Sequence, residues 1–239
     1  MNKIHKSILI LTPFFSPNIG GVETHLDDLV SVLDEKGYKV FGTFRRVSTP
    51  NFWRLQSLGI FDKINLIPAD LLDMGSLLEA LKTSDPDEVY NLAAGSFVAT
   101  SFKEAVGNAE ITGQAVTKFP EAIRHQNSSI KFYQASSSEM YGDNQFKIQN
   151  ENTPFLPSSP YAAAKVMAYV FCQYYRDVFG MYVSTGILYN HESPRRSVEY
   201  VARKITRQVA LIAAGKATDL VLGNLATKID FGFAKEYME

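Results

Sequence analysis

The chain has 239 residues, of which 46% are hydrophobic and 21% are charged, and this length favours a single α/β domain with an appended segment. Its 15 glycines and 10 prolines are spread along a chain without long polar tracts, which excludes disordered and collagen-like architectures. A net charge of −1 indicates no nucleic-acid partner, and the single cysteine, Cys172, excludes an internal disulfide and a zinc site built from several cysteines.

The first residues, MNKIHKSILILTPFF, place two lysines before an apolar run, as a secretory signal does. The run is short and is interrupted by Thr12 and Pro13, and no A-x-A-like cleavage site follows, so a buried first strand is the better interpretation. No stretch approaches the ~20 apolar residues that a membrane span needs. We therefore expect a cytoplasmic protein without a membrane partner.

Short apolar runs alternate with helical patterns along the rest of the chain. The apolar runs predict six strands, at residues 7–11, 40–44, 64–68, 88–92, 131–135 and 183–188. Helical periodicity covers five main segments, at residues 22–33, 74–82, 109–124, 160–179 and 199–215, and Gly37 ends the first of them. A further helical pattern runs towards Glu239, and Pro120 interrupts the segment at residues 109–124. The alternation predicts a doubly wound parallel sheet of Rossmann type, with ligands bound at the carboxyl ends of its strands.

Tyr161 and Lys165 stand four residues apart near the start of the predicted long helix, so both lie on one helical face. Ser158 or Ser159 is placed to cap this helix, with Pro160 in its first turn. A lysine ammonium beside a phenol lowers the pKa of tyrosine from about 10, which makes Tyr161 a candidate base near neutral pH. The same spacing also occurs in ordinary amphipathic helices.

Ser137 lies in the serine-rich turn after the fifth predicted strand, where it can donate to the substrate oxygen that Tyr161 would deprotonate. Together with Tyr161 and Lys165, it resembles the Ser/Thr-Tyr-Lys centre of the extended short-chain dehydrogenase/reductase family. Longer motifs resemble the GDP-mannose 4,6-dehydratase family from about residue 40 to Glu239: YNLAAGSFV from Tyr90, KFYQASSSEMYG from Lys131, TPFLPSSPYAAAK from Thr153, NHESPRR from Asn190, RKITRQVA from Arg203 and LGNL from Leu222.

The resemblance implies that GDP-mannose is converted to GDP-4-keto-6-deoxymannose with loss of water, by internal hydride transfer that regenerates the cofactor. Tyr161 would take the proton of the hexose 4-hydroxyl, Ser137 would orient that hydroxyl, and Lys165 would bind the cofactor ribose and hold the tyrosine ionised. Glu139 would remove the proton at carbon 5 and help to expel the 6-hydroxyl. Such a carboxylate distinguishes a dehydratase from a plain epimerase, although a glutamate in a turn is also a common surface residue.

Arg45 and Arg46 follow the second predicted strand, where an acidic residue would otherwise bind the ribose 2′-hydroxyl, so NADP is preferred over NAD. The resemblance implies further cofactor contacts at Asp70, Leu71, Leu92, Ala93, Ala94, Ser96, His191 and Arg196. It places substrate contacts at Ser137, Asn190 and Lys204. The family also assembles as dimers or tetramers, so we expect a homo-oligomer; no metal site is expected.

The glycine fingerprint T-G-x-x-G-x-x-G that opens the family is replaced here by TPFFSPNIGGVETH. Gly20 and Gly21 remain near the first helix as candidate pyrophosphate contacts, or as a plain turn, while Pro13 and Pro17 each remove a backbone donor. Residues 8–40 instead resemble the first strand, loop and helix of GT-B type retaining glycosyltransferases. Gly95 stands where the family has glutamine.

Gly107 stands where the family has tyrosine, and the family chain continues beyond the point that matches Glu239. We therefore expect a dinucleotide-binding domain over residues 1–189, with an atypical first unit over residues 1–40, and an incomplete substrate-binding region over residues 190–239. Two alternatives to an active dehydratase remain open: a catalytically silent remnant that binds a nucleotide or a partner chain, and a fragment of a sugar-nucleotide glycosyltransferase.

Overall fold

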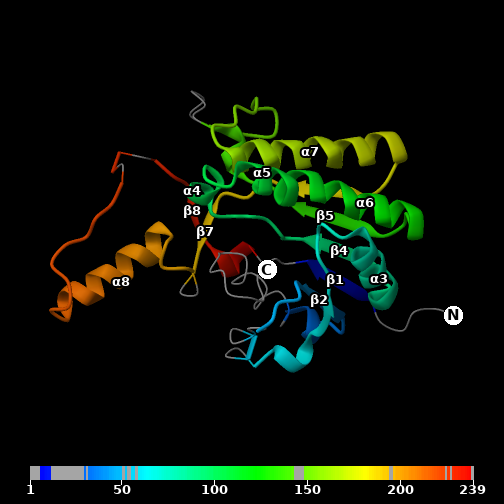
Figure 1. Cartoon of the computed structure of the whole chain (residues 1–239), viewed down its shortest axis with the longest axis horizontal. Coiled ribbons are helices and arrows are strands. Elements are labelled where there is room, and N and C mark those ends of the chain that lie inside the picture. The colour runs from blue at the N-terminus through cyan, green and yellow to red at the C-terminus, as the bar shows by residue number, and fades with distance from the viewer. Residues whose placement is uncertain are drawn as a thin grey trace.

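The computed structural model describes residues 6–11, 30, 32–49, 52, 55–56, 59–142, 148–193, 196–223, 225–226 and 228–237. A parallel sheet of six strands forms their centre, in the order β3-β2-β1-β4-β5-β6 (Figure 1). The strands are β1 (Ser7–Leu11), β2 (Lys39–Phe44), β3 (Asn65–Pro68), β4 (Glu88–Asn91), β5 (Lys131–Ala135) and β6 (Val183–Gly186). The strand order reverses between β1 and β4, so the predicted doubly wound sheet is confirmed.

All five residues of β1 are buried because the sheet is covered on both faces. Leu9 and Leu11 pack into one apolar cluster, and Ile8 and Ile10 pack into another. The helices that contribute to the first cluster lie along one face of the sheet in Figure 1, and they are α3 (Met74–Ser84), α6 (Ala115–Gln126) and α7 (Pro160–Phe179). Because successive side chains of β1 point to opposite faces of the sheet, this strand contributes to two separate apolar cores.

The remaining elements are short, apart from α8 (Val201–Ala213). They are the helices α4 (Val98–Ser101) and α5 (Ala105–Asn108), the π-helix η2 (Ala109–Gln114), the 3-10 helices η1 (Phe61–Lys63), η3 (Ser138–Tyr141) and η4 (Ala234–Tyr237), and the strands β7 (Asn190–Glu192) and β8 (Phe231–Phe233). In η2 the N–H of Ala115, which follows the segment, donates to the carbonyl of Glu110 five residues earlier. The helical run from α5 through η2 to α6 is thus widened in its middle.

Helix α7 begins and ends where the sequence predicts. Ser159 caps it by accepting a hydrogen bond from the N–H of Ala162 at 3.1 Å, Pro160 occupies the first turn, and Gly180 ends it in the left-handed conformation with φ 63°. Since the cap fixes where the helix starts, it also fixes the positions of Tyr161 and Lys165 along the helix axis.

Two expectations about helices are wrong. Helix α6 continues through Pro120, whose ring is buried, and this burial offsets the loss of one backbone hydrogen bond. The C-terminal stretch is only partly helical, because β8 pairs in parallel with β7 before η4 begins. The pairing joins segments about forty residues apart, and a local pattern carries no information on such a partner.

Buried amide side chains make hydrogen bonds at the end of β4, where the chain leaves the sheet. Asn91 is fully buried; its Nδ2 donates to Gln134 Oε1 at 2.7 Å, and its Oδ1 accepts from the N–H of Ala93 at 3.1 Å. Gln134 lies on the neighbouring strand β5 and donates in turn to the carbonyl of Ala135 at 2.8 Å. These bonds hold the residues after β4 beside the point where the strand order reverses.

Candidate functional site

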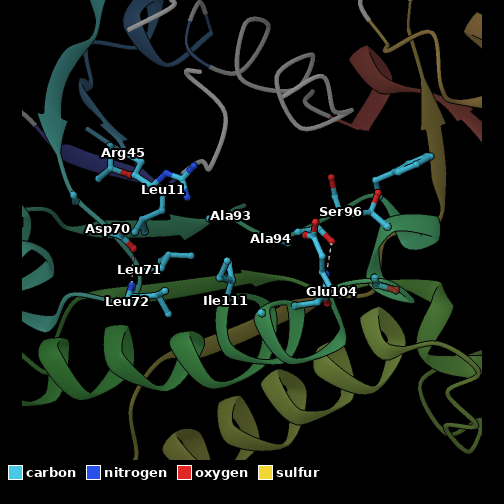
Figure 2. A pocket seen from close by; sticks show the side chains of 18 of the residues that line it. Leu11, Arg45, Asp70, Leu71, Leu72, Ala93, Ala94, Ser96, Glu104 and Ile111 are labelled. Atoms are coloured by element: carbon cyan, nitrogen blue, oxygen red, sulfur yellow. Dashed lines mark hydrogen bonds between the residues drawn. The ribbon is translucent and has the colours of Figure 1, made fainter. Parts of the chain in front are cut away.

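A cavity of about 550 Å³ opens at the carboxyl ends of β1 to β4 (Figure 2). Its wall combines the ends of β1 and β2, the turn after β3, the loop after β4, and the helical run that begins with α4. This is the position at which doubly wound sheets bind ligands, and the volume lies within the usual range for small-molecule sites.

Six of the residues predicted to bind a cofactor line this cavity: Arg45, Asp70, Leu71, Ala93, Ala94 and Ser96. Figure 2 shows Arg45, Asp70 and Leu71 at one end of the cavity and Ser96 at the other. The turn that carries Asp70 is held locally, since the Asp70 carboxylate accepts the N–H of Leu72 at 2.9 Å and the Asp70 N–H donates to Ser76 Oγ at 3.0 Å.

Two other predicted contacts, Leu92 and Arg46, are described but do not belong to the cavity wall. Leu92 packs against the apolar cluster that contains Ile8, and Arg46 is exposed; neither lines the cavity. Gly20 and Gly21 lie outside the described residues, as does most of the loop on which the glycosyltransferase alternative rests. The roles of these residues therefore stay predictions.

The predicted reactive residues come together beside the cavity. Ser137 caps η3 at the end of β5, and its side chain shares a hydrogen bond with Tyr161 in the first turn of α7. Lys165 Nζ lies 5.7 Å from the centre of the Tyr161 ring and donates to the carbonyl of Ala135 at 2.7 Å. The N–H of Tyr161 donates to Oγ of Ser101, a cavity-lining residue, at 3.4 Å. The cluster thus adjoins the cavity wall directly.

Burial governs the ionisation of this cluster. It raises the pKa of Tyr161 above the ordinary value, and the hydrogen bond from Ser137 opposes this rise without cancelling it. Burial also lowers the pKa of Lys165 to about 8. The expected lowering of the Tyr161 pKa is therefore wrong for the chain as it stands, because the loss of water around the phenolate outweighs the Ser137 hydrogen bond and the charge of Arg196.

Glu139 belongs to the same group of side chains. It is exposed at the start of η3, its N–H donates to Ser137 Oγ at 3.2 Å, and its charge adds to the rise in the Tyr161 pKa. An exposed carboxylate therefore lies within electrostatic reach of a buried phenol.

The segment after β6 approaches the cavity through stacked side chains. The guanidinium of Arg196 lies 3.6 Å from the Tyr200 ring centre, and its Nε is 3.4 Å from Glu192 Oε2. The Tyr200 ring meets the edge of Phe97, which lines the cavity, with 5.7 Å between ring centres. Arg196 is thus linked to the cavity wall through Tyr200.

The other residues predicted in this segment do not line the cavity. Asn190 and His191 lie in β7, where His191 Nδ1 is 2.7 Å from the carbonyl of Tyr189 and burial lowers the pKa of the ring. Lys204 is exposed on α8. The structure does not bring these three side chains to the cavity.

Sequence reasoning missed several residues of the cavity wall. They are Ser101, Glu104 and Asn108, from the helical run that starts at α4, and Glu199, which precedes α8. No spacing motif marks them, since they follow strand ends by many residues. The signal available was weaker: the helical run directly follows the loop after β4, and the first turns of such a helix face the ligand edge of the sheet.

Among the described helices, none is long and apolar enough to cross a membrane. Within the same residues, no group of three or more His, Cys, Asp or Glu side chains is placed to hold a metal ion.

Comparison with known proteins places these observations in a family. A family model described as GDP-mannose 4,6 dehydratase matches residues 27–239. "GDP-mannose 4,6 dehydratase 1" of Arabidopsis thaliana is 44% identical over 222 residues, which cover 88% of this chain and 61% of the relative. The human "GDP-mannose 4,6 dehydratase" is 42% identical over 219 residues, covering 88% and 59%. The chain thus spans about three-fifths of the length of these relatives.

Solved structures of the same architecture superpose on the chain. The dTDP-glucose 4,6-dehydratase DesIV of Streptomyces venezuelae, with NAD and TYD bound, has a TM-score of 0.79 and 20% identity and covers 97% of this chain and 69% of its own. The UDP-N-acetylglucosamine 4-epimerase of Methanobrevibacter ruminantium M1 has a TM-score of 0.77 and 24% identity, with coverage of 98% and 71%. At these identities the likeness concerns the fold.

We expect Lys165→Met to stabilise the chain, because it removes a buried ammonium group. At pH 7 the free energy of unfolding should rise by about 1–3 kcal/mol. The lowered pKa of Lys165, about 8, means that wild-type stability rises as the pH goes from 8 to the ordinary lysine value of 10.5. The advantage of the variant should shrink over this window. Urea unfolding at several pH values measures the difference.

Lys216→Met is the control for this prediction, because Lys216 is exposed and its replacement should leave stability almost unchanged. A Lys165→Met chain that unfolds more readily than the wild type at pH 7 would contradict this prediction. It would show that the interactions of the ammonium group stabilise the fold by more than the desolvation of the group costs.

Proposed function

The chain belongs to the GDP-mannose 4,6-dehydratase family, and we propose that it acts in the dehydration of GDP-mannose to GDP-4-keto-6-deoxymannose. The observation that carries this proposal is the grouping of Ser137, Glu139, Tyr161 and Lys165 beside the cavity at the reversal of strand order. A silent binding remnant, the alternative left open by the sequence, would have no reason to keep two bases next to one substrate position.

The cavity residues fit a nicotinamide dinucleotide. Small residues at Ala93, Ala94 and Gly95 leave room for close approach of a ligand to the backbone, and Arg45 at the opposite end suits a ribose 2′-phosphate. We therefore propose NADP as the cofactor. When bound, it would supply the acceptor and donor of a hydride next to the tyrosine.

Tyr161 is proposed to accept the proton of the hexose 4-hydroxyl. Its burial makes the phenolate rare but strongly basic, and the Ser137 hydroxyl and the charge of Arg196 favour the ionised form. The Lys165 ammonium lies 5.7 Å from the centre of the Tyr161 ring. Lys165 can act as a cation at neutral pH because its pKa of about 8 keeps it mostly protonated. Ser137 is placed to hydrogen-bond both the phenol and the substrate hydroxyl.

Glu139 is proposed as the base for the proton at carbon 5. Its side chain is exposed and so is accessible to a sugar that enters beside Tyr161. After oxidation of carbon 4, Glu139 takes the proton from carbon 5, the electron pair left there expels the 6-hydroxyl, and the hydroxyl leaves as water with the proton that Glu139 returns. This elimination separates a dehydratase from an epimerase. The dimer or tetramer expected from the resemblance stays a prediction.

Tyr161→Phe tests the proposed base. It should lower the rate of water loss from GDP-mannose by about a thousandfold, because no other described group at this position can take the hydroxyl proton. Mass spectrometry of the nucleotide sugar measures the reaction, in the presence of NADP+ and without net formation of NADPH. Tyr174→Phe is the matched control, since Tyr174 is exposed on the same helix. Equal rates for Tyr161→Phe and the wild type would contradict the role.

Glu139→Gln tests the elimination step separately. The variant should still oxidise carbon 4, so reduced nicotinamide should accumulate on the protein while no water is lost from the sugar. Absorbance of the reduced cofactor and the mass of the product measure the two steps. Glu151→Gln, an exposed residue of a nearby turn, should behave as the wild type. A Glu139→Gln chain that forms the normal product at the normal rate would remove this role from Glu139.

Arg45→Ala tests the preference for NADP. Loss of the guanidinium should weaken NADP+ binding about tenfold or more while leaving NAD+ binding within about twofold. Calorimetric titration of the purified chain measures both affinities. Arg46→Ala should have the smaller effect, because Arg46 does not line the cavity. An equal loss for both cofactors would assign Arg45 to another part of the ligand.

A further inference from the structure

The loop after β4 is held at the cavity wall by two hydrogen bonds, both made by the backbone of Gly95. The N–H of Gly95 donates to Thr112 Oγ1 at 3.0 Å, and its carbonyl accepts from Asn108 Nδ2 at 2.9 Å. Thr112 is fully buried in η2, and Asn108 is the last residue of α5. Both backbone groups of a cavity-lining residue are therefore held by side chains of the helical run on the opposite wall.

The absence of a side chain at Gly95 is part of this arrangement. A Cβ at this position would lie 2.7 Å from Asn108 Nδ2, a separation that real Cβ atoms essentially never show. Gly95 does not adopt a positive φ, so its backbone conformation does not require glycine. The constraint lies in a side chain: a Cβ at 95 would displace the end of the Asn108 side chain from its present place.

Fold stability alone does not account for Asn108. Its Oδ1 is buried and has no hydrogen-bond partner among the described residues. An unsatisfied buried acceptor offsets much of the gain from the single bond that Nδ2 makes. Gly95 is half-buried and lines a cavity, where water can replace a lost donor. Asn108 is thus better explained by where it holds Gly95 than by what it adds to stability.

The same helical run is packed against the catalytic helix. A Cβ at Gly113, the residue after Thr112, would lie 3.2 Å from the carbonyl of Ala164, so η2 and α7 approach each other closely here. Ala164 precedes Lys165 directly and is three residues after Tyr161. The segment that holds Gly95 therefore contacts the backbone that carries the reactive side chains.

We propose that Asn108 and Thr112 are positioning residues, which set the loop of residues 93–97 at a fixed distance from Tyr161 and so hold the nicotinamide half of the dinucleotide. The proposal rests on the proposed function. It assigns this half because Ser96 and Glu104 lie at the end of the cavity opposite Arg45 and Asp70 (Figure 2). The adenosine half, next to Arg45, lies away from the two bonds.

Two ligands separate positioning from general damage. NADP+ spans the whole cavity, whereas adenosine 2′-monophosphate carries only the half that meets Arg45. Asn108→Ala and Thr112→Val should each weaken NADP+ about three- to tenfold in calorimetric titrations, the loss of roughly one hydrogen bond. Binding of adenosine 2′-monophosphate should stay within about twofold. Equal weakening of both ligands, or unchanged NADP+ binding, would overturn the proposal.

Conservative variants complete this test. Thr112→Ser keeps the hydroxyl and should restore most of the NADP+ affinity that Thr112→Val loses. Thr117→Val is the matched control, because the Thr117 hydroxyl donates to the carbonyl of Gln114 on the same run without lining the cavity, and its affinity should equal that of the wild type. Failure of Thr112→Ser to recover affinity would assign the effect of Thr112→Val to packing.

A measurement without ligand tests the contact at Gly95 itself. Gly95→Ala should lower the urea midpoint of unfolding in the wild-type background and have much less effect in the Asn108→Ala background, where the colliding amide is absent. Equal effects in both backgrounds would show that Asn108 does not occupy that space. A wild-type chain that binds no NADP+ would overturn the proposed function and the nicotinamide role. The comparison of Gly95→Ala in the two backgrounds would still decide whether Asn108 holds Gly95.

Discussion

The central strand β1 is flanked by β2 on one side and β4 on the other, and everything at the cavity depends on this pairing. Leu11, the last residue of β1, is level with Thr43 and Asn91 in the two neighbours. Beyond that level the chain leaves β2 and β4 in different directions, since the strand order reverses here. The opening between them is the cavity, and its floor is the apolar end of β1.

Helix α7 places the proposed reactive groups, Tyr161 and Lys165, beside that opening, and their burial has a cost in solvation. Tyr161 and Lys165 are both buried, and burial opposes the charged form of each. Such a pair is unfavourable for stability, but it makes the phenolate strongly basic once it forms. The capped start of α7 and the close contact of η2 with Ala164 hold the pair in place against this cost.

Local patterns were sufficient for the sheet and for α7. The five residues of β1 are apolar because both faces of the strand are buried, so the run SILIL predicts it directly. The helix from Pro160 to Phe179 carries its own start and stop signals in Ser159 and Gly180. β8 carries no comparable local signal, because its backbone partner lies in β7.

The sequence by itself determined the sheet, the spacing of Tyr161 and Lys165 and the motifs that assign the family, because these depend on residues close together in the chain or on matches to known proteins. Only the tertiary structure decided that burial raises the Tyr161 pKa and that Arg45, but not Arg46, lines the cavity. The tertiary structure also gives the reason for a glycine at position 95, because a side chain there would meet the amide of Asn108. Desolvation and steric exclusion depend on neighbours that folding brings from distant parts of the chain, and no local spacing encodes them.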